Sequence, residues 1–150
     1  MRLLPRSIDQ QIQVPAGNSA YLLGQAVGTQ NYICQVAQSG YFWKFIGPQA
    51  TLFVSLPVKN SQILPQITTH FLSPNPAEGG LARATWQGSF DSSAVWAKMI
   101  ASSTDPAYVA PGAIPWFLLQ VVGSAVGPAQ PNDVHTPVEH NRWLGAGEWL

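Results

Sequence analysis

Charged side chains are scarce in this sequence. Only 9% of the 150 residues are Asp, Glu, Lys or Arg, and the seven basic residues balance the seven acidic ones. A nucleic-acid-binding surface needs clustered Lys and Arg, so this balance argues against a nucleic-acid-binding protein. Apolar residues make up 46% of the chain, which argues against an intrinsically disordered protein. The composition therefore predicts a folded domain with a weakly charged surface.

Long apolar runs are also missing. No segment reaches the roughly 18 residues of a transmembrane helix, so the chain is not expected to span a membrane. The start, Met1 to Gln10, has no apolar core of a secretory signal peptide. Either the protein is cytoplasmic or the beginning of the chain is absent from this sequence. We expect residues 1–10 to form a disordered leader and residues 11–132 to form a single β-rich domain.

Cysteine is nearly absent, because Cys34 is the single one. It cannot form an internal disulfide, and we expect it to be a small buried apolar residue; a reactive or intermolecular thiol is the alternative. Sequence motifs for nucleotides and metals are missing as well, including a Gly-rich dinucleotide turn, a Walker A loop, CxxC and HExxH. His135, Glu139 and His140 lie close together, but in an atypical segment. We therefore predict no cofactor and no metal.

What the sequence does contain is a set of short, apolar strand-like segments separated by Gly and Pro. The most apolar one, Trp116 to Val122, lies between Pro115 and Gly123 and predicts a strand that is buried on both faces. Residues 28–36 and 41–46 predict a hairpin around the turn at residues 38–40. With no helical period of useful length, the pattern predicts an all-β domain, a β-sandwich or barrel of about eight to ten short strands. Trp43, Trp86, Trp96 and Trp116 are expected in its core.

Candidate site residues are few. His70 lies beside an apolar strand face, where an imidazole can act as a base or contact a ligand, although such a ring more often bonds a loop carbonyl. Asp91 and Ser92, with Ser89 nearby, lie in a turn after Trp86 and are simplest to explain as turn caps. A Ser-His-Asp set formed by these residues lacks a nucleophile-elbow sequence. His70 and Trp86 are the candidate ligand-binding residues.

Several motifs occur in an order that resembles one protein family. They are Ile12–Gly17, Gly28–Cys34, Trp43–Phe45, Gly47–Leu52, His70, Phe71, Trp86, Val95 and Ala113–Leu119. The chain resembles, over about residues 11 to 128, an uncharacterised family of bacterial and fungal domains that are often exported. Some members are labelled malate dehydrogenase. The resemblance implies one β-rich domain and an extracellular or cell-envelope location, and it implies no established activity.

The end of the chain departs from this family pattern. Family members typically close with Asn-Thr-x-Gly-Gly and a terminal Gly-Cys, whereas Glu139 to Leu144 stand here. One codon choice for these six residues, read one base later, encodes Asn-Thr-Thr-Gly-Gly-Ser. We therefore interpret residues 133–150 as an atypical tail that arises from a frameshift, which also removes the terminal Cys that the resemblance pairs with Cys34. The reading frames of the coding DNA test this interpretation.

Two classes of function remain open. The sequence favours a small exported or envelope binding module for a small ligand, a glycan or another protein. The alternative is an enzyme, either a hydrolase that uses His70 with Asp91 and Ser92 or an oxidoreductase, which rests on the family label alone. A malate dehydrogenase needs a dinucleotide-binding βαβ unit and Arg side chains for the two carboxylates. Arg83 is the single Arg between residues 11 and 132, so we predict that this activity is absent.

Overall fold

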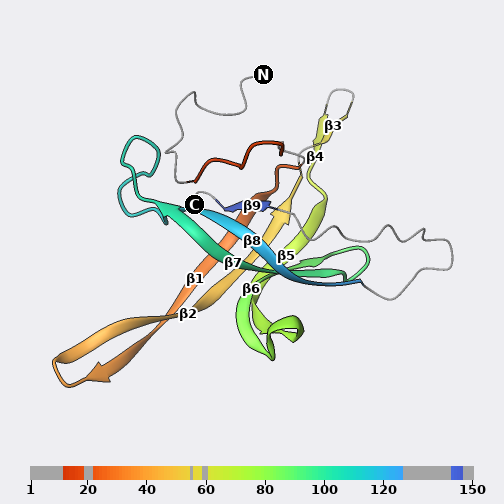
Figure 1. Ribbon diagram of the computed structural model, residues 1–150. Helices are drawn as coiled ribbons and strands as arrows, with labels where there is room; N and C mark the ends of the chain where they lie inside the picture. Colours follow the sequence, from red (N-terminus) through yellow and green to blue (C-terminus); the bar gives the residue numbers. More distant parts are fainter. Residues whose placement is uncertain (1–11, 19–21, 55, 59–60, 127–142, 147–150) are drawn as a thin grey trace.

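The computed structural model describes residues 12–18, 22–54, 56–58, 61–126 and 143–146 (Figure 1). Within this part of the chain the regular elements are strands, apart from short 3-10 turns. The strands are β1 (Gln25–Ala37), β2 (Gly40–Phe53), β3 (Leu56–Val58), β4 (Ser61–Ile63), β5 (Gln66–Asn75), β6 (Leu81–Gly88), β7 (Ala94–Ser103), β8 (Trp116–Ala125) and β9 (Trp143–Ala146). A 3-10 turn, η2 (Pro76–Glu78), joins β5 to β6. The predicted all-β class is confirmed.

Seven of these strands form one antiparallel sheet in the order β1-β2-β5-β6-β7-β8-β9, and β3 and β4 form a separate two-stranded ribbon. The expected sandwich or barrel is not confirmed. A barrel requires its first and last strands to pair, and among the described residues β1 and β9 are the two edges of an open sheet. The sheet is strongly twisted, so the β1–β2 hairpin crosses the direction of β7 and β8 (Figure 1).

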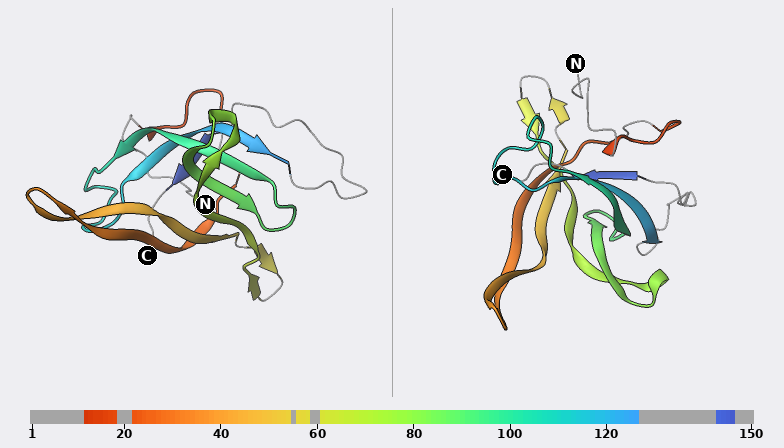
Figure 2. Two further views of the ribbon diagram at one scale, coloured as in Figure 1. Left: turned by 90° about the horizontal axis from the view of Figure 1, so that it is seen from below. Right: turned by 60° about the vertical axis from the view of Figure 1, so that its left-hand side comes forward.

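The β1–β2 hairpin is the longest pairing in the sheet. The predicted turn is confirmed, because Ala37 pairs with Gly40 around residues 38 and 39. A sequence argument based on Gly and Pro would end the second strand at Gly47-Pro48, but β2 continues through both residues. Instead the register shifts between Asn31 and Tyr32, which leaves an extra residue on β2 beside Gly47 at φ +145°. Such a bulge bends a strand without ending it. The far end of the hairpin projects away from the other strands in each view (Figure 1, Figure 2).

Three other expectations differ from the structure. Residues 59–65 have a loop-like sequence, but the strand β4 lies there and pairs with β3. The sequence at residues 11–14 and 19–23 predicts strands, but the described residues 12–18 and 22–24 contain none. Trp43 is 72% exposed and Cys34 is exposed, so neither belongs to the core. Both lie on the projecting hairpin, where no further layer of the described chain covers them.

The turn between β5 and β6 is closed by a polar cluster that is buried at Asn75 and half-buried at Glu78 and Arg83. Asn75 is fully buried; its Oδ1 accepts from the backbone N of Ala77 at 3.1 Å, and its Nδ2 donates to Glu78 Oε2 at 2.7 Å. Two guanidinium nitrogens of Arg83 donate to the same carboxylate at 2.8 and 2.7 Å. These hydrogen bonds, from Arg83 first and from Asn75 second, lower the pKa of Glu78 to about 2. The carboxylate is therefore ionised at neutral pH and fixes the turn.

The strand β8, which lies next to the edge strand β9, is buried on both faces, as the sequence predicts. Leu118 and Leu119 are consecutive, so their side chains point to opposite faces, and they are 6% and 5% exposed. β7 pairs along one edge of β8 and β9 pairs along the other. The strand β9 belongs to the segment 133–150 interpreted above as an atypical tail. Residues 133–142 and 147–150 of that segment, like the leader at 1–10, lie outside the described residues.

Replacing Leu119 with Ala should reduce the free energy of unfolding by about 2–5 kcal/mol, because buried apolar surface is lost and a cavity remains. Met99 pairs with Leu119 across β7 and β8 and is 58% exposed, so Met99→Ala is the matched control. We expect that control to change stability by no more than about 0.5 kcal/mol. Urea denaturation measures both changes. A loss below about 1 kcal/mol for Leu119→Ala would show that β8 is not the core strand.

Candidate functional site

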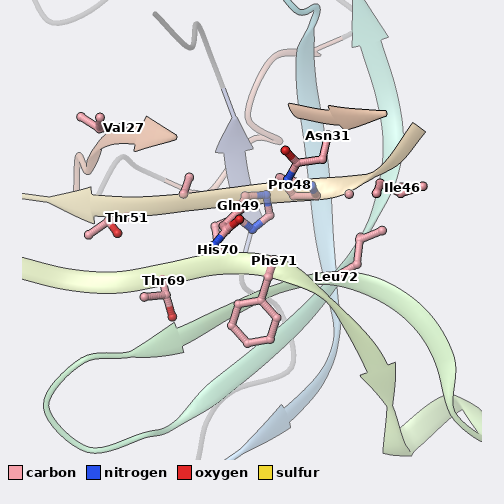
Figure 3. Close-up of a pocket in the computed structure, with 12 residues that line it drawn as sticks. Val27, Asn31, Ile46, Pro48, Gln49, Thr51, Thr69, His70, Phe71 and Leu72 are labelled. Atoms are coloured by element: carbon pink, nitrogen blue, oxygen red, sulfur yellow. The ribbon is translucent and has the colours of Figure 1, made fainter. Parts of the chain in front are cut away.

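His70 lies where two neighbouring strands separate. It is on β5, where it pairs with Ala50 of β2 on one side and with Trp86 of β6 on the other. From Ala50 to Phe53, β2 runs beside β5, but before Ala50 it pairs with β1 alone among the described strands. After His70, β5 no longer pairs with β2 and continues beside β6. The two strands diverge on one side of His70, as Figure 3 shows, and we call this point the fork.

The His70 ring is held on two sides. It stacks on the indole of Trp86, with ring centroids 4.0 Å apart and an interplanar angle of 16°. Its Nδ1 lies 2.8 Å from the carbonyl oxygen of Thr85. A carbonyl oxygen only accepts, so Nδ1 carries the hydrogen and the neutral ring has its lone pair on Nε2. Burial lowers the pKa of His70 below its ordinary value, and the bond to the Thr85 carbonyl opposes this change. The ring is therefore neutral at pH 7.

A chain of hydrogen bonds fixes the strands behind this ring. Trp96 Nε1 donates to Ser73 Oγ at 2.9 Å, and Ser73 Oγ lies 2.7 Å from Thr85 Oγ1. Thr85 Oγ1 donates in turn to the carbonyl oxygen of Arg83 at 3.0 Å. Thr85 is 1% exposed, so these bonds satisfy polar atoms that water does not reach. They tie β5, β6 and β7 together and so fix the register that places His70 on Trp86.

Two cavities adjoin His70. The first, of about 670 Å³, opens at the fork and is lined by residues 46–51 of β2 and 69–72 of β5, with Val27 and Asn31 of β1 (Figure 3). We call it the fork cavity. The second, of about 390 Å³, reaches from β1 across the sheet to β8 and to Ile114 and Pro115. Because four aromatic rings line it, those of Tyr32, Phe45, Trp86 and Phe117, we call it the aromatic cavity.

The aromatic cavity combines apolar walls with a few polar groups. Leu72, Met99 and Leu119 line it together with the rings, and its polar lining residues are Gln30, His70, Arg83 and Lys98. Arg83 is bound to Glu78, so their charges cancel locally and Lys98 contributes the remaining positive charge. A concave apolar cavity with a few convergent polar groups is the usual form of a site for a small organic molecule.

The other residues singled out in the sequence lie in the turn between β6 and β7. Asp91 Oδ1 accepts from the backbone N and the Oγ of Ser93, at 2.9 and 2.7 Å, and these bonds lower the pKa of Asp91. Ser92 has a left-handed φ of 58°, and Ser89 Oγ accepts from Gln66 Nε2 at 3.0 Å. Neither Asp91 nor Ser92 lines the two cavities that His70 adjoins. The structure thus brings His70 and Trp86 together and gives Asp91 a turn-closing role.

Several site residues were not found from the sequence. Arg83 and Lys98 line the aromatic cavity, and Thr85 holds His70, yet none belongs to a recognisable motif. Alternation along β6 would have placed Ala82, Ala84 and Trp86 on one face, but it does not show which face is hollow. Among the described residues there is no group of three or more His, Cys, Asp or Glu side chains suited to a metal ion. Nor does that part of the chain contain a helix that is long and apolar enough to cross a membrane.

A family model matches most of the chain. The model described as "Protein of unknown function (DUF3455)" matches residues 15–134. No curated protein and no solved structure matches the chain. The resemblance to an uncharacterised family is thereby confirmed, whereas the malate dehydrogenase label and the departure of the C-terminal end stay predictions.

The stability of the protein should depend on pH through His70. Its folded pKa is lowered below 6.5, so as the pH falls the unfolded chain binds this proton before the folded protein does. The contribution of His70 to the free energy of unfolding is fully present above pH 6.5. Below that pH it decreases, by up to about 1.4 kcal/mol per pH unit, until the folded pKa is reached. In His70→Phe, which keeps a ring against Trp86, this part of the slope should vanish. Urea denaturation at a series of pH values measures both; equal slopes would contradict the assignment.

Proposed function

The chain belongs to the DUF3455 family of unknown function, and on that premise we propose that it is a binding module for a small organic molecule, held in the aromatic cavity beside His70 and Trp86. The observation that carries the proposal is the cavity itself. Its volume of about 390 Å³ lies within the range of small-molecule sites, which is about 300–1,000 Å³. Aromatic and aliphatic side chains form most of its walls, and the polar side chains that line it are few.

The lining indicates the class of ligand. The apolar walls favour a flat or aliphatic body, because burying such a surface contributes about 25 cal/mol per Å². Lys98 carries the positive charge that Glu78 leaves uncompensated, so a ligand with one anionic group fits better than a cationic one. A glycan is a weaker candidate. Sugars stack on exposed ring faces, and one face of Trp86 is already covered by His70.

The binding proposal is supported over the enzyme alternative by the position of the polar groups. A hydrolase would need a nucleophile and a carboxylate beside His70. Asp91 instead receives two hydrogen bonds from Ser93 in an exposed turn. Burial keeps His70 neutral, and its stack on Trp86 fixes the plane of the ring. Such a ring shapes a binding wall, with His70 and Trp86 as the proposed ligand-contacting residues.

Titration with 8-anilinonaphthalene-1-sulfonate, an anionic aromatic probe, tests the binding proposal. We expect saturable fluorescence enhancement that is weakened roughly tenfold or more in Ala84→Trp, because the new ring occupies the cavity that Ala84 lines. Ala107→Trp, in the exposed turn between β7 and β8, adds the same ring outside the cavity and should leave binding unchanged. Equal binding by both variants would mean that the probe binds outside the aromatic cavity, and it would contradict the proposal.

We also carry over an extracellular or cell-envelope location as part of the proposal. It rests on the family resemblance and on the low charge of the chain. Fractionation of the producing cells, followed by immunoblotting, tests it: the protein should be enriched in the medium or envelope fraction relative to a cytoplasmic marker. Recovery in the cytoplasmic fraction alone would contradict it.

A further inference from the structure

The projecting end of the β1–β2 hairpin, residues 31–46, carries an unusual concentration of exposed apolar side chains. We call this segment the arm. Cross-strand partners share a face, so the pairs Tyr32–Phe45, Cys34–Trp43 and Val36–Tyr41 form one surface. All six of these side chains are exposed, and Val36, Tyr41 and Trp43 are 76%, 80% and 72% exposed. We call this surface the aromatic face of the arm.

From this surface we infer that the protein forms a dimer in which the aromatic faces of two arms pack against each other about a two-fold axis. A two-fold contact buries the same patch on both copies, so the patch must be complementary to itself. The aromatic face contains no charged residue, and Lys44, the one charged residue of the arm, lies on the opposite face as the partner of Ile33. Packing two such faces together therefore brings no like charges into contact.

The size of the face agrees with a dimer contact. Taking about 150–250 Å² for each aromatic side chain, the exposed fractions of the four aromatic residues give roughly 500 Å², and Val36 and Cys34 extend this surface. Each partner in a stable protein–protein interface buries about 800 Å². The edge strand β1 is also open to a neighbouring chain. Its 13 residues contain none of the charged residues or prolines that keep edge strands from pairing.

A second copy fits the arm better than a lipid surface does. The tip of the arm is the polar turn Gln38-Ser39-Gly40, and insertion tip first would bury its amide, hydroxyl and backbone groups without partners. One lysine also gives little attraction to anionic lipid. Against a second copy, the tip remains in water while the aromatic face is covered. The contact would adjoin the proposed ligand site, because Tyr32 and Phe45 line the aromatic cavity as well, whereas Tyr41 and Trp43 do not line it.

Sedimentation velocity over a concentration series, under reducing conditions, tests the dimer. We expect a monomer–dimer equilibrium in the wild-type protein. Trp43→Glu should raise the dissociation constant roughly tenfold or more, since a carboxylate would be buried in the contact. The matched control is Phe42→Glu, whose side chain lies on the opposite face, pairs with Gln35 and is 46% exposed. This control should dimerise like the wild type, and thermal melts should show both variants folded.

A bismaleimide cross-linker gives a second measurement, made on the wild-type protein. Cys34 is in the middle pair of that face, so two copies packed about the axis bring their thiols together. A covalent dimer should form in the wild type and not in Cys34→Ser. Monomeric wild type at every concentration would overturn the inference, as would equal dissociation by the Trp43 and Phe42 variants. A monomer that cosediments with phosphatidylcholine–phosphatidylglycerol vesicles would overturn it in favour of a lipid partner.

Discussion

The end of pairing between β2 and β5 at Ala50 and His70 determines the shape of the described chain. Up to this pair the two strands share backbone hydrogen bonds; past it each follows a different partner. Gly47 permits the bend, because its φ of +145° suits a residue without a side chain and a Cβ there would lie 3.1 Å from Leu72. The fork cavity, the aromatic cavity and the projecting arm all begin at this separation.

His70 is the residue that occupies the separation point. Burying an imidazole away from water is unfavourable unless its polar atoms are bonded. The Thr85 carbonyl meets this requirement for Nδ1, and stacking on Trp86 covers the ring with a surface of matching shape. The chain of bonds from Trp96 through Ser73 to Thr85 holds the carbonyl in place from the other side of β6. The ring thus stabilises the fork and forms a wall of both cavities.

Local features of this fold can be predicted from the sequence, whereas the way in which its strands cover one another cannot. The apolar run at Trp116–Val122 and the turn between β1 and β2 are visible as patterns of neighbouring residues. His70 and Trp86 are visible as separate candidate residues, but no local pattern predicts that they stack. The exposure of Trp43 and Cys34 is not visible either, because alternation in a strand shows which residues share a face but not whether a second layer covers that face. For the same reason, the sequence does not predict that Arg83 and Lys98 line a cavity. That cavity is formed by strands that are far apart in sequence. For the proposed ligand-contacting residues, the residue types were predictable, whereas their enclosure was not.

The order of strands in the main sheet follows the order of the chain, interrupted by the small β3–β4 ribbon alone among the described strands. Each strand therefore pairs with its predecessor in sequence, and loop closure between neighbours is entropically inexpensive for a β protein. A chain emerging from the ribosome could add its strands one after another, without waiting for a distant segment. The core strand β8 arrives late in this order, so the early hairpin would spend part of synthesis without the main apolar core beside it.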